Sequence, residues 1–202
     1  MEGFPLFVSA LAAALWLGLA PCTLLAAADA PDAPWSIEHL MQRFAQVKSA
    51  KAKFVERRHL RILSAPLESS GTLVYTAPGH LEKQTLTPKP ESLVLDGDTL
   101  TFEDKTRNRR RTLRLQEYPV IWAFVESIRS TLAGDLQSLN RFYRVGLEGS
   151  ETDWRLTLDP RDPAIERMVS QIRIAGSGTS IRRVETTEAE GDRSVMTITE
   201  VR

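Results

Sequence analysis

Three histidines and several scattered serines are the side chains of this 202-residue chain that could perform chemistry. His39, His59 and His80 lie far apart in the sequence, and no pair has the spacing of metal ligands on one helix or strand. His80 and Glu82 would share one face of a strand, but no third ligand accompanies them. No Gly-x-Ser-x-Gly elbow presents a serine nucleophile. We therefore expect no enzyme activity, no cofactor and no metal.

A run of arginines, Arg107 and 109–111, is the strongest local charge feature. It could bind phosphates, but it lacks the interleaved aromatic residues of single-strand nucleic-acid sites. The whole chain has 26 Lys and Arg against 26 Asp and Glu, so its net charge gives no drive toward nucleic acid. We expect either a solvated loop or a docking patch for an acidic partner or a lipid head group.

The first 28 residues have the pattern of an export signal. Residues 4–28 carry no charge, and the tract ends in the small residues 26–28 that signal peptidase requires. We expect cleavage after Ala28, which leaves residues 29–202 as one mature domain. Cys22 is the only cysteine, so this mature chain suits an oxidising compartment. Two alternatives remain: the tract stays as a membrane anchor, or Cys22 is acylated within a lipobox-like sequence.

Two segments show the periodicity of amphipathic helices. Ser36 can cap the first, whose apolar residues are Ile37, Leu40, Met41, Phe44 and Val47. Pro119 opens the second and Gly134 follows it. Its stripe contains Ile121, Phe124, Val125, Ile128 and Leu132, with Trp122 on the flank.

The remaining chain from Ala52 onward changes to the period of two that is typical of strands. Asp96-Gly97 is a hairpin signal, because both central positions of a type I′ turn require positive φ. The pattern predicts about ten antiparallel strands in a meander that curls towards a barrel, with two helices to cover it. We place the strands at residues 52–63, 69–76, 80–86, 91–95, 99–103, 110–115, 142–148, 154–158, 169–175, 181–187 and 193–201.

Strict alternation puts apolar side chains on one face of the later strands, such as Tyr143, Val145 and Leu147. A curled sheet of this size has more apolar lining than one short helix can fill. The concave face then encloses either an open hydrophobic cavity or a filled core, and alternation alone does not separate the two.

The stretch from Gly71 to Lys83, followed by Pro88, Pro90 and residues 95–100, resembles the signature of the periplasmic lipoprotein-carrier family, the LolA-like proteins. The similarity extends to the leader, the first helix and the helix after Pro119, and so covers nearly the whole mature chain.

The resemblance implies an incomplete β-barrel covered by two helices. It also implies a carrier in the periplasm, whose apolar cavity shields the acyl chains of a lipoprotein or other lipid-like cargo on the way to the outer membrane. An inner-membrane donor and an outer-membrane acceptor protein would be its partners, and we expect a monomer. The expected ligand-binding residues are Leu73, Tyr75, Leu81, Leu93, Leu95, Trp122, Phe124 and Ile128. In the family an arginine commonly precedes the proline of the second-strand motif and fastens the lid helix; here that position is Ala77, so we expect an unfastened lid.

Two other functions fit the same fold. One is a periplasmic regulator that senses lipids, and the other is an outer-membrane-anchored lipoprotein acceptor, which requires acylation of Cys22. The short chain leaves little room for a second signalling domain, which favours the carrier over the regulator.

Overall fold

The computed structural model of the protein describes residues 35–201. The predicted cleavage point after Ala28 and the alternative lipid site at Cys22 lie outside these residues. Within them, eleven strands form one antiparallel sheet in the order β6-β5-β4-β3-β2-β1-β11-β10-β9-β8-β7. Strands β6 and β7 are the two edges, so the sheet is an open barrel, as the sequence predicted.

Neighbouring strands in the sheet are neighbours in the sequence with one exception, the pairing of β1 with β11. The strands are β1 (Ser49–His59), β2 (Leu67–Thr76), β3 (His80–Thr87), β4 (Glu91–Asp96), β5 (Thr99–Asp104), β6 (Arg109–Arg114), β7 (Tyr143–Ser150), β8 (Asp153–Pro160), β9 (Val169–Ser177), β10 (Ser180–Glu188) and β11 (Arg193–Glu200). The helices are α1 (Ile37–Phe44), α2 (Pro119–Ala133), α3 (Leu136–Phe142) and α4 (Pro163–Glu166), with a 3-10 turn, η1, at Leu115–Glu117.

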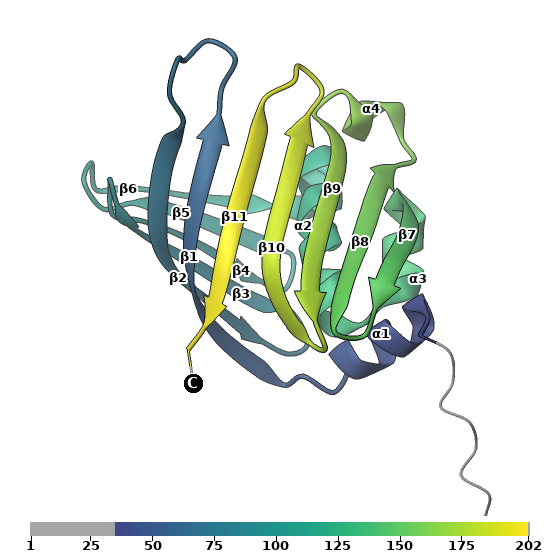
Figure 1. The fold of residues 1–202 in the computed structure, drawn as a ribbon. Helices are drawn as coiled ribbons and strands as arrows, with labels where there is room; N and C mark the ends of the chain where they lie inside the picture. The colour runs from purple at the N-terminus through teal and green to yellow at the C-terminus, as the bar shows by residue number, and fades with distance from the viewer. Residues whose placement is uncertain (1–34, 202) are drawn as a thin grey trace, which may run out of the picture. The chain divides into compact units, whose positions relative to one another are not determined.

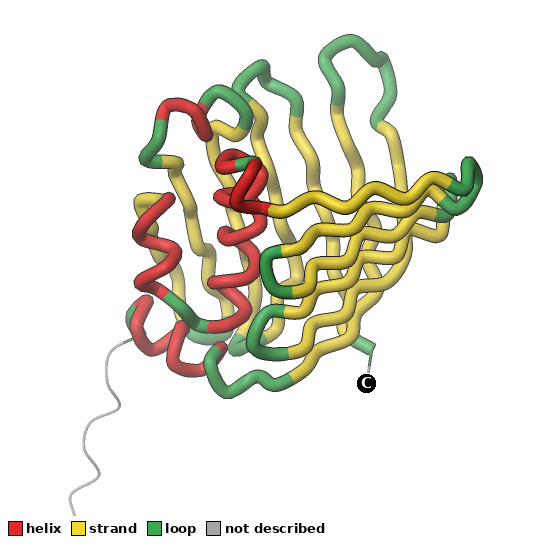
Figure 2. Tube along the Cα trace, turned by 180° about the vertical axis from the view of Figure 1, so that it is seen from behind, coloured by secondary structure: helices red, strands yellow, loops and turns green. Residues whose placement is uncertain are grey.

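The sheet bends so strongly that its two halves form two layers whose strands cross (Figure 1). Strands β7–β11 run side by side in Figure 1, while β3–β6 cross behind them in a different direction. Viewed from behind, the helices lie in front of β7–β10, beside the β3–β6 layer (Figure 2). The concave side therefore holds α2 against both halves of the sheet.

Helix α1 helps to fill the β7–β9 end of the concave face. The Ser36 hydroxyl caps it by accepting a hydrogen bond from the His39 backbone N–H at 3.3 Å. Phe44 meets Trp154 of β8 edge to face, with ring centroids 5.8 Å apart. The buried core here consists of Leu40, Met41, Phe44, Leu139, Tyr143, Trp154, Leu156, Leu158, Val169, Ile172 and Ile174. This end of the barrel is a filled core.

Helices α2 and α3 meet at a tight junction. Gly134 ends α2 with a φ of 68°, and a Cβ built on it would lie 2.1 Å from the Met41 carbonyl oxygen of α1. Asp135 then caps α3 by accepting the Ser138 backbone N–H at 2.9 Å. Glycine is therefore needed here both for its left-handed backbone and for its missing side chain.

Sequence periodicity missed two helices and misplaced one strand. It predicted two helices, whereas α3 and α4 are also present; both are shorter than the window in which an amphipathic period can be recognised. Strand β1 ends at His59 rather than continuing to Leu63. The following loop carries Ile62, which is 90 % exposed although its apolar type suggested a strand. Helix α1 ends at Phe44, short of Val47.

Candidate functional site

An apolar cavity of about 390 Å³ lies between the bent sheet and α2. Its walls come from β1 to β5, from β10 and β11, and from one face of the helix. The filled core at the β7–β9 end and this cavity together answer the question that alternation left open. The concave face is packed at one end and hollow at the other.

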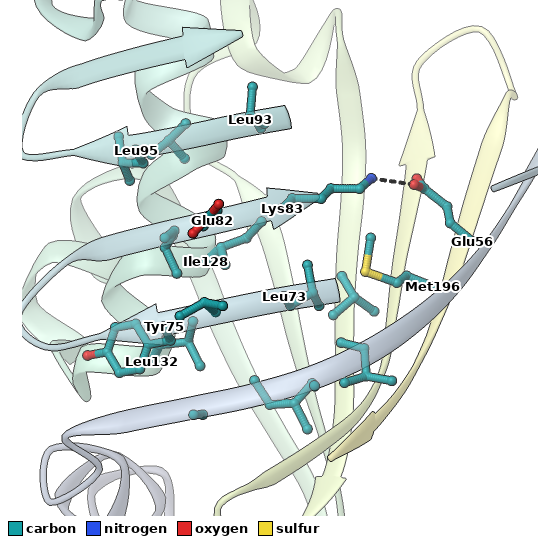
Figure 3. A pocket seen from close by; sticks show the side chains of 18 of the residues that line it. Glu56, Leu73, Tyr75, Glu82, Lys83, Leu93, Leu95, Ile128, Leu132 and Met196 are labelled. Atoms are coloured by element: carbon teal, nitrogen blue, oxygen red, sulfur yellow. Dashed lines mark hydrogen bonds and ion pairs between the residues drawn. The ribbon is translucent and has the colours of Figure 1, made fainter. Parts of the chain in front are cut away.

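The register of the strands decides which side chains form the sheet wall of the cavity. Tyr75 of β2 pairs with Leu81 of β3, which pairs with Leu95 of β4, and their side chains share the concave face. Leu73 and Leu93 occupy the next inward positions on β2 and β4. Figure 3 shows Leu73 and Tyr75 on one strand and Leu93 and Leu95 on another.

Helix α2 is the lid of this cavity, because its whole apolar stripe faces inward. The residues that border the cavity are Ile121, Phe124, Val125, Ile128 and Leu132, which are the five stripe positions predicted from the sequence. Ile128 and Leu132 appear beside the strand residues in Figure 3. Ala123 on another face of the helix is completely buried, and its carbonyl accepts the Tyr143 hydroxyl at 3.0 Å. Burial raises the pKa of Tyr143 to about 12, so this hydroxyl stays protonated as a donor.

Seven of the eight residues expected to bind a ligand line the cavity together: Leu73, Tyr75, Leu81, Leu93, Leu95, Phe124 and Ile128. Trp122 does not line it, and that placement was wrong. Its indole N–H donates to Glu126 at 3.0 Å, and its ring lies 6.0 Å from that of Phe142. A flanking position on a helix turns away from the stripe, which is the reason for the difference. Ligand binding by the other seven stays a prediction.

Sequence reasoning missed the lining that β10 and β11 contribute. Val184, Met196 and Ile198 border the cavity. Phe54 of β1 pairs with Ile198 of β11, two strands that are far apart in the sequence. Alternation within β11 predicts that Met196 and Ile198 share one face of the strand. No local pattern in the sequence predicts that β11 pairs with β1.

The lid is fastened, contrary to the expectation from Ala77. Arg129 of α2 donates to the Gly97 carbonyl in the β4–β5 turn at 3.1 Å and lies 3.7 Å from the Asp98 carboxylate. Its guanidinium is positioned by Glu126, a buried carboxylate one turn earlier on the same helix. The arginine therefore comes from the helix rather than from the strand, and only the folded chain brings it to this turn.

A cluster of three polar residues interrupts the mostly apolar wall: Glu56 of β1, Lys83 of β3 and Ser194 of β11. The Lys83 ammonium lies 2.5 Å from one oxygen of Glu56, and the Ser194 hydroxyl donates to the other oxygen at 2.6 Å. Figure 3 shows the ion pair between β1 and β3. Burial acts to raise the pKa of Glu56, but Lys83, Ser194 and Arg58 outweigh it and hold this pKa below its ordinary value. Glu56 is thus ionised at neutral pH.

The alternation that assigned Leu81 to the concave face also assigns Lys83 to it, so the sequence held a weak signal for this cluster.

The arginine run predicted as a loop or docking patch lies elsewhere, in the turn before β6 and along that exposed edge strand. It is largely strand rather than loop. Within residues 35–201, no helix is both long enough and apolar enough to cross a membrane.

An open antiparallel sheet with an apolar cavity beneath a lid helix defines a class of proteins that can enclose a hydrophobic ligand. Residues 26–199 match the family described as outer membrane lipoprotein carrier protein LolA-like. The chain belongs to this family. No curated protein sequence gives a significant match.

Solved structures with a similar arrangement are distant in sequence. A LolA superfamily protein from Nitrosomonas europaea is 10 % identical, with 83 % of this chain and 94 % of that chain covered and a TM-score of 0.44. A DUF1329 family protein from Desulfovibrio piger is 10 % identical, with coverages of 81 % and 88 % and a TM-score of 0.44. The MucA/MucB complex of Pseudomonas aeruginosa contains a chain that is 14 % identical, with coverages of 81 % and 55 % and a TM-score of 0.45.

Proposed function

We propose that the protein is a periplasmic carrier that binds the acyl chains of a lipoprotein or another lipid-like cargo and moves it toward the outer membrane. The function is one of binding rather than catalysis. The observation that carries the proposal is the apolar cavity of about 390 Å³ beneath α2, in a chain of the LolA-like family.

The physical basis is the transfer of acyl methylenes out of water. Each buried methylene is worth about 0.8 kcal/mol, so a carrier competes with a membrane only if its wall is apolar along the whole chain it holds. Leucine, isoleucine, valine and tyrosine residues supply most of that wall, from both the sheet and the lid. A cargo would enter by movement of α2, and this movement would break the hydrogen bond from Arg129 to the Gly97 carbonyl.

A cavity-blocking substitution tests the proposal. Ala50 and Lys51 are neighbours on β1; Ala50 lines the cavity, and Lys51 points to the opposite, exposed face. We expect Ala50→Phe to abolish binding of a fluorescent fatty acid, while the matched control Lys51→Phe binds it as the wild type does. Native mass spectrometry of protein from its own periplasm should show a bound acyl compound. No fatty-acid uptake by the wild type, together with no co-purified acyl compound, would overturn the proposal.

A further inference from the structure

The polar cluster of Glu56, Lys83 and Ser194 has a feature that the ion pair alone does not explain. An ammonium group has three N–H donors, and Lys83 uses one of them on Glu56. Among residues 35–201, its nitrogen has no second hydrogen-bond acceptor. The ammonium also lies 4.8 Å from the centroid of the Phe54 ring, which holds it in place. Lys83 therefore presents unused donors at a fixed point of the cavity wall.

Glu56, in contrast, has a hydrogen-bond partner on each of its two carboxylate oxygens. One carboxylate oxygen receives Lys83 and the other receives the Ser194 hydroxyl. The side chain is only 13 % exposed, against 28 % for Lys83. Glu56 thus positions the ammonium, and the lysine is the more accessible partner of the two. Replacing such a partly buried ion pair by apolar residues commonly costs a protein no stability, so stability alone does not account for it.

The cluster lies away from the part of the cavity that α2 covers most closely. Leu95 and Leu100 form a buried core with Val125 of the lid, in the strand row that contains Leu81. Lys83 belongs to the next inward row, with Leu73 and Leu93 as its cross-strand neighbours. Leu93 is 37 % exposed, so this row borders the accessible part of the cavity. The site has an apolar deep end and a cationic donor near its opening.

We propose that the cavity selects acyl amphiphiles with an anionic head group, whose carboxylate or phosphate oxygens accept hydrogen bonds from Lys83 while the acyl chain lies under α2. This inference rests on the proposed function and adds to it the chemical class of the cargo. Two further carboxylates border the cavity, Glu82 and Glu200. Glu82 accepts a hydrogen bond from Gln84 of its own strand, and Glu200 stands opposite Ala52 at the end of β11. Lys83 is the one basic side chain among the described lining residues, so it sets where an anion binds.

The test compares matched amphiphiles by displacement of a fluorescent fatty acid. Palmitate is measured against hexadecanol, and lysophosphatidate against monoacylglycerol, so the two arms separate a carboxylate from a phosphate. We expect at least one anionic probe to bind about tenfold more tightly than its neutral counterpart, because a hydrogen bond to a charged group is stronger than one to a neutral group. Lys83→Met should remove this preference, and Glu56→Gln should increase it by removing a nearby negative charge. Lys53→Met, on the exposed face of β1, is the matched control and should leave it unchanged.

Equal binding of anionic and neutral probes by the wild type would overturn the inference, as would a preference that survives Lys83→Met. If Lys83→Met does not fold, Glu56→Gln decides the question. The inference predicts that this variant prefers anionic probes more strongly than the wild type does, whereas an ion pair with only a structural role predicts no such rise. Failure of every amphiphile to bind would instead refute the proposed function itself.

Discussion

Replacing Ile128 by glutamate tests whether α2 is the wall of an open cavity or part of a packed core. Ile128 lies on the cavity face of α2 and is partly buried, whereas Ala123 on another face of the same helix is completely buried. Phe124 is a less specific probe, because it also packs against the filled core at the β7–β9 end. Ile128→Glu and Ala123→Glu therefore introduce the same charge into two different environments on one helix.

The burial of each side chain sets the expected changes in ligand affinity and in the free energy of unfolding. Ile128→Ala removes apolar groups worth about 0.8 kcal/mol each when fully buried, and partial burial reduces the total to about 1 kcal/mol, or roughly fivefold in affinity. A carboxylate beside the acyl chain adds a desolvation cost of at least about 2 kcal/mol, so the total is about 3 kcal/mol and Ile128→Glu should weaken binding by roughly 150-fold or more. In the empty cavity water can reach this charge, and the free energy of unfolding should change by less than about 1 kcal/mol.

The assay has two parts, titration with a fluorescent fatty acid and urea unfolding followed by circular dichroism. Ala123→Glu places a charge where no space exists and should cost about 4 kcal/mol or more of stability. Wild-type affinity in Ile128→Glu would show that the ligand does not lie under α2. A loss of stability in Ile128→Glu equal to that in Ala123→Glu would show that the lid is part of a closed core.

Three other substitutions test the lid, the sheet and a helix cap. Arg129→Met removes the tie between α2 and the β4–β5 turn, and stopped-flow measurements should show faster fatty-acid uptake; an unchanged rate would contradict this role. Gly71→Ala would bring a Cβ within 1.8 Å of the Gln84 carbonyl oxygen, so its melting temperature should fall far more than that of an exposed alanine substitution. Asp135→Ala removes the cap of α3 and should cost about 1 kcal/mol at neutral pH. Burial acts to raise the pKa of Asp135, but hydrogen bonds from Ser138 hold it below its ordinary value of 3.8, so unfolding at a series of pH values should show this cost shrinking as the pH falls below that value.

Local sequence determined most of the elements of this fold. The 3.6-residue period of Ile121, Phe124 and Val125 identified both the lid helix and the face it presents to the cavity. Alternation identified the inward residues of β2 to β4, and Asp96-Gly97 located the turn between β4 and β5. The type I′ assignment was wrong, because Asp96 pairs with Thr99 and the central residues are Gly97 and Asp98, of which only Gly97 has positive φ. These features depend on neighbours within a few residues, which is why they can be read from the chain alone.

Tertiary structure decided what the cavity contains and how it is closed. The pairing of β1 with β11 brings Ser194 beside Glu56, and the bend of the sheet brings Lys83 to the same carboxylate. In the same way Arg129 reaches the turn at Gly97 only after α2 has packed across the sheet. Such contacts join segments far apart in the sequence, and their geometry depends on register and sheet curvature, which no local period encodes.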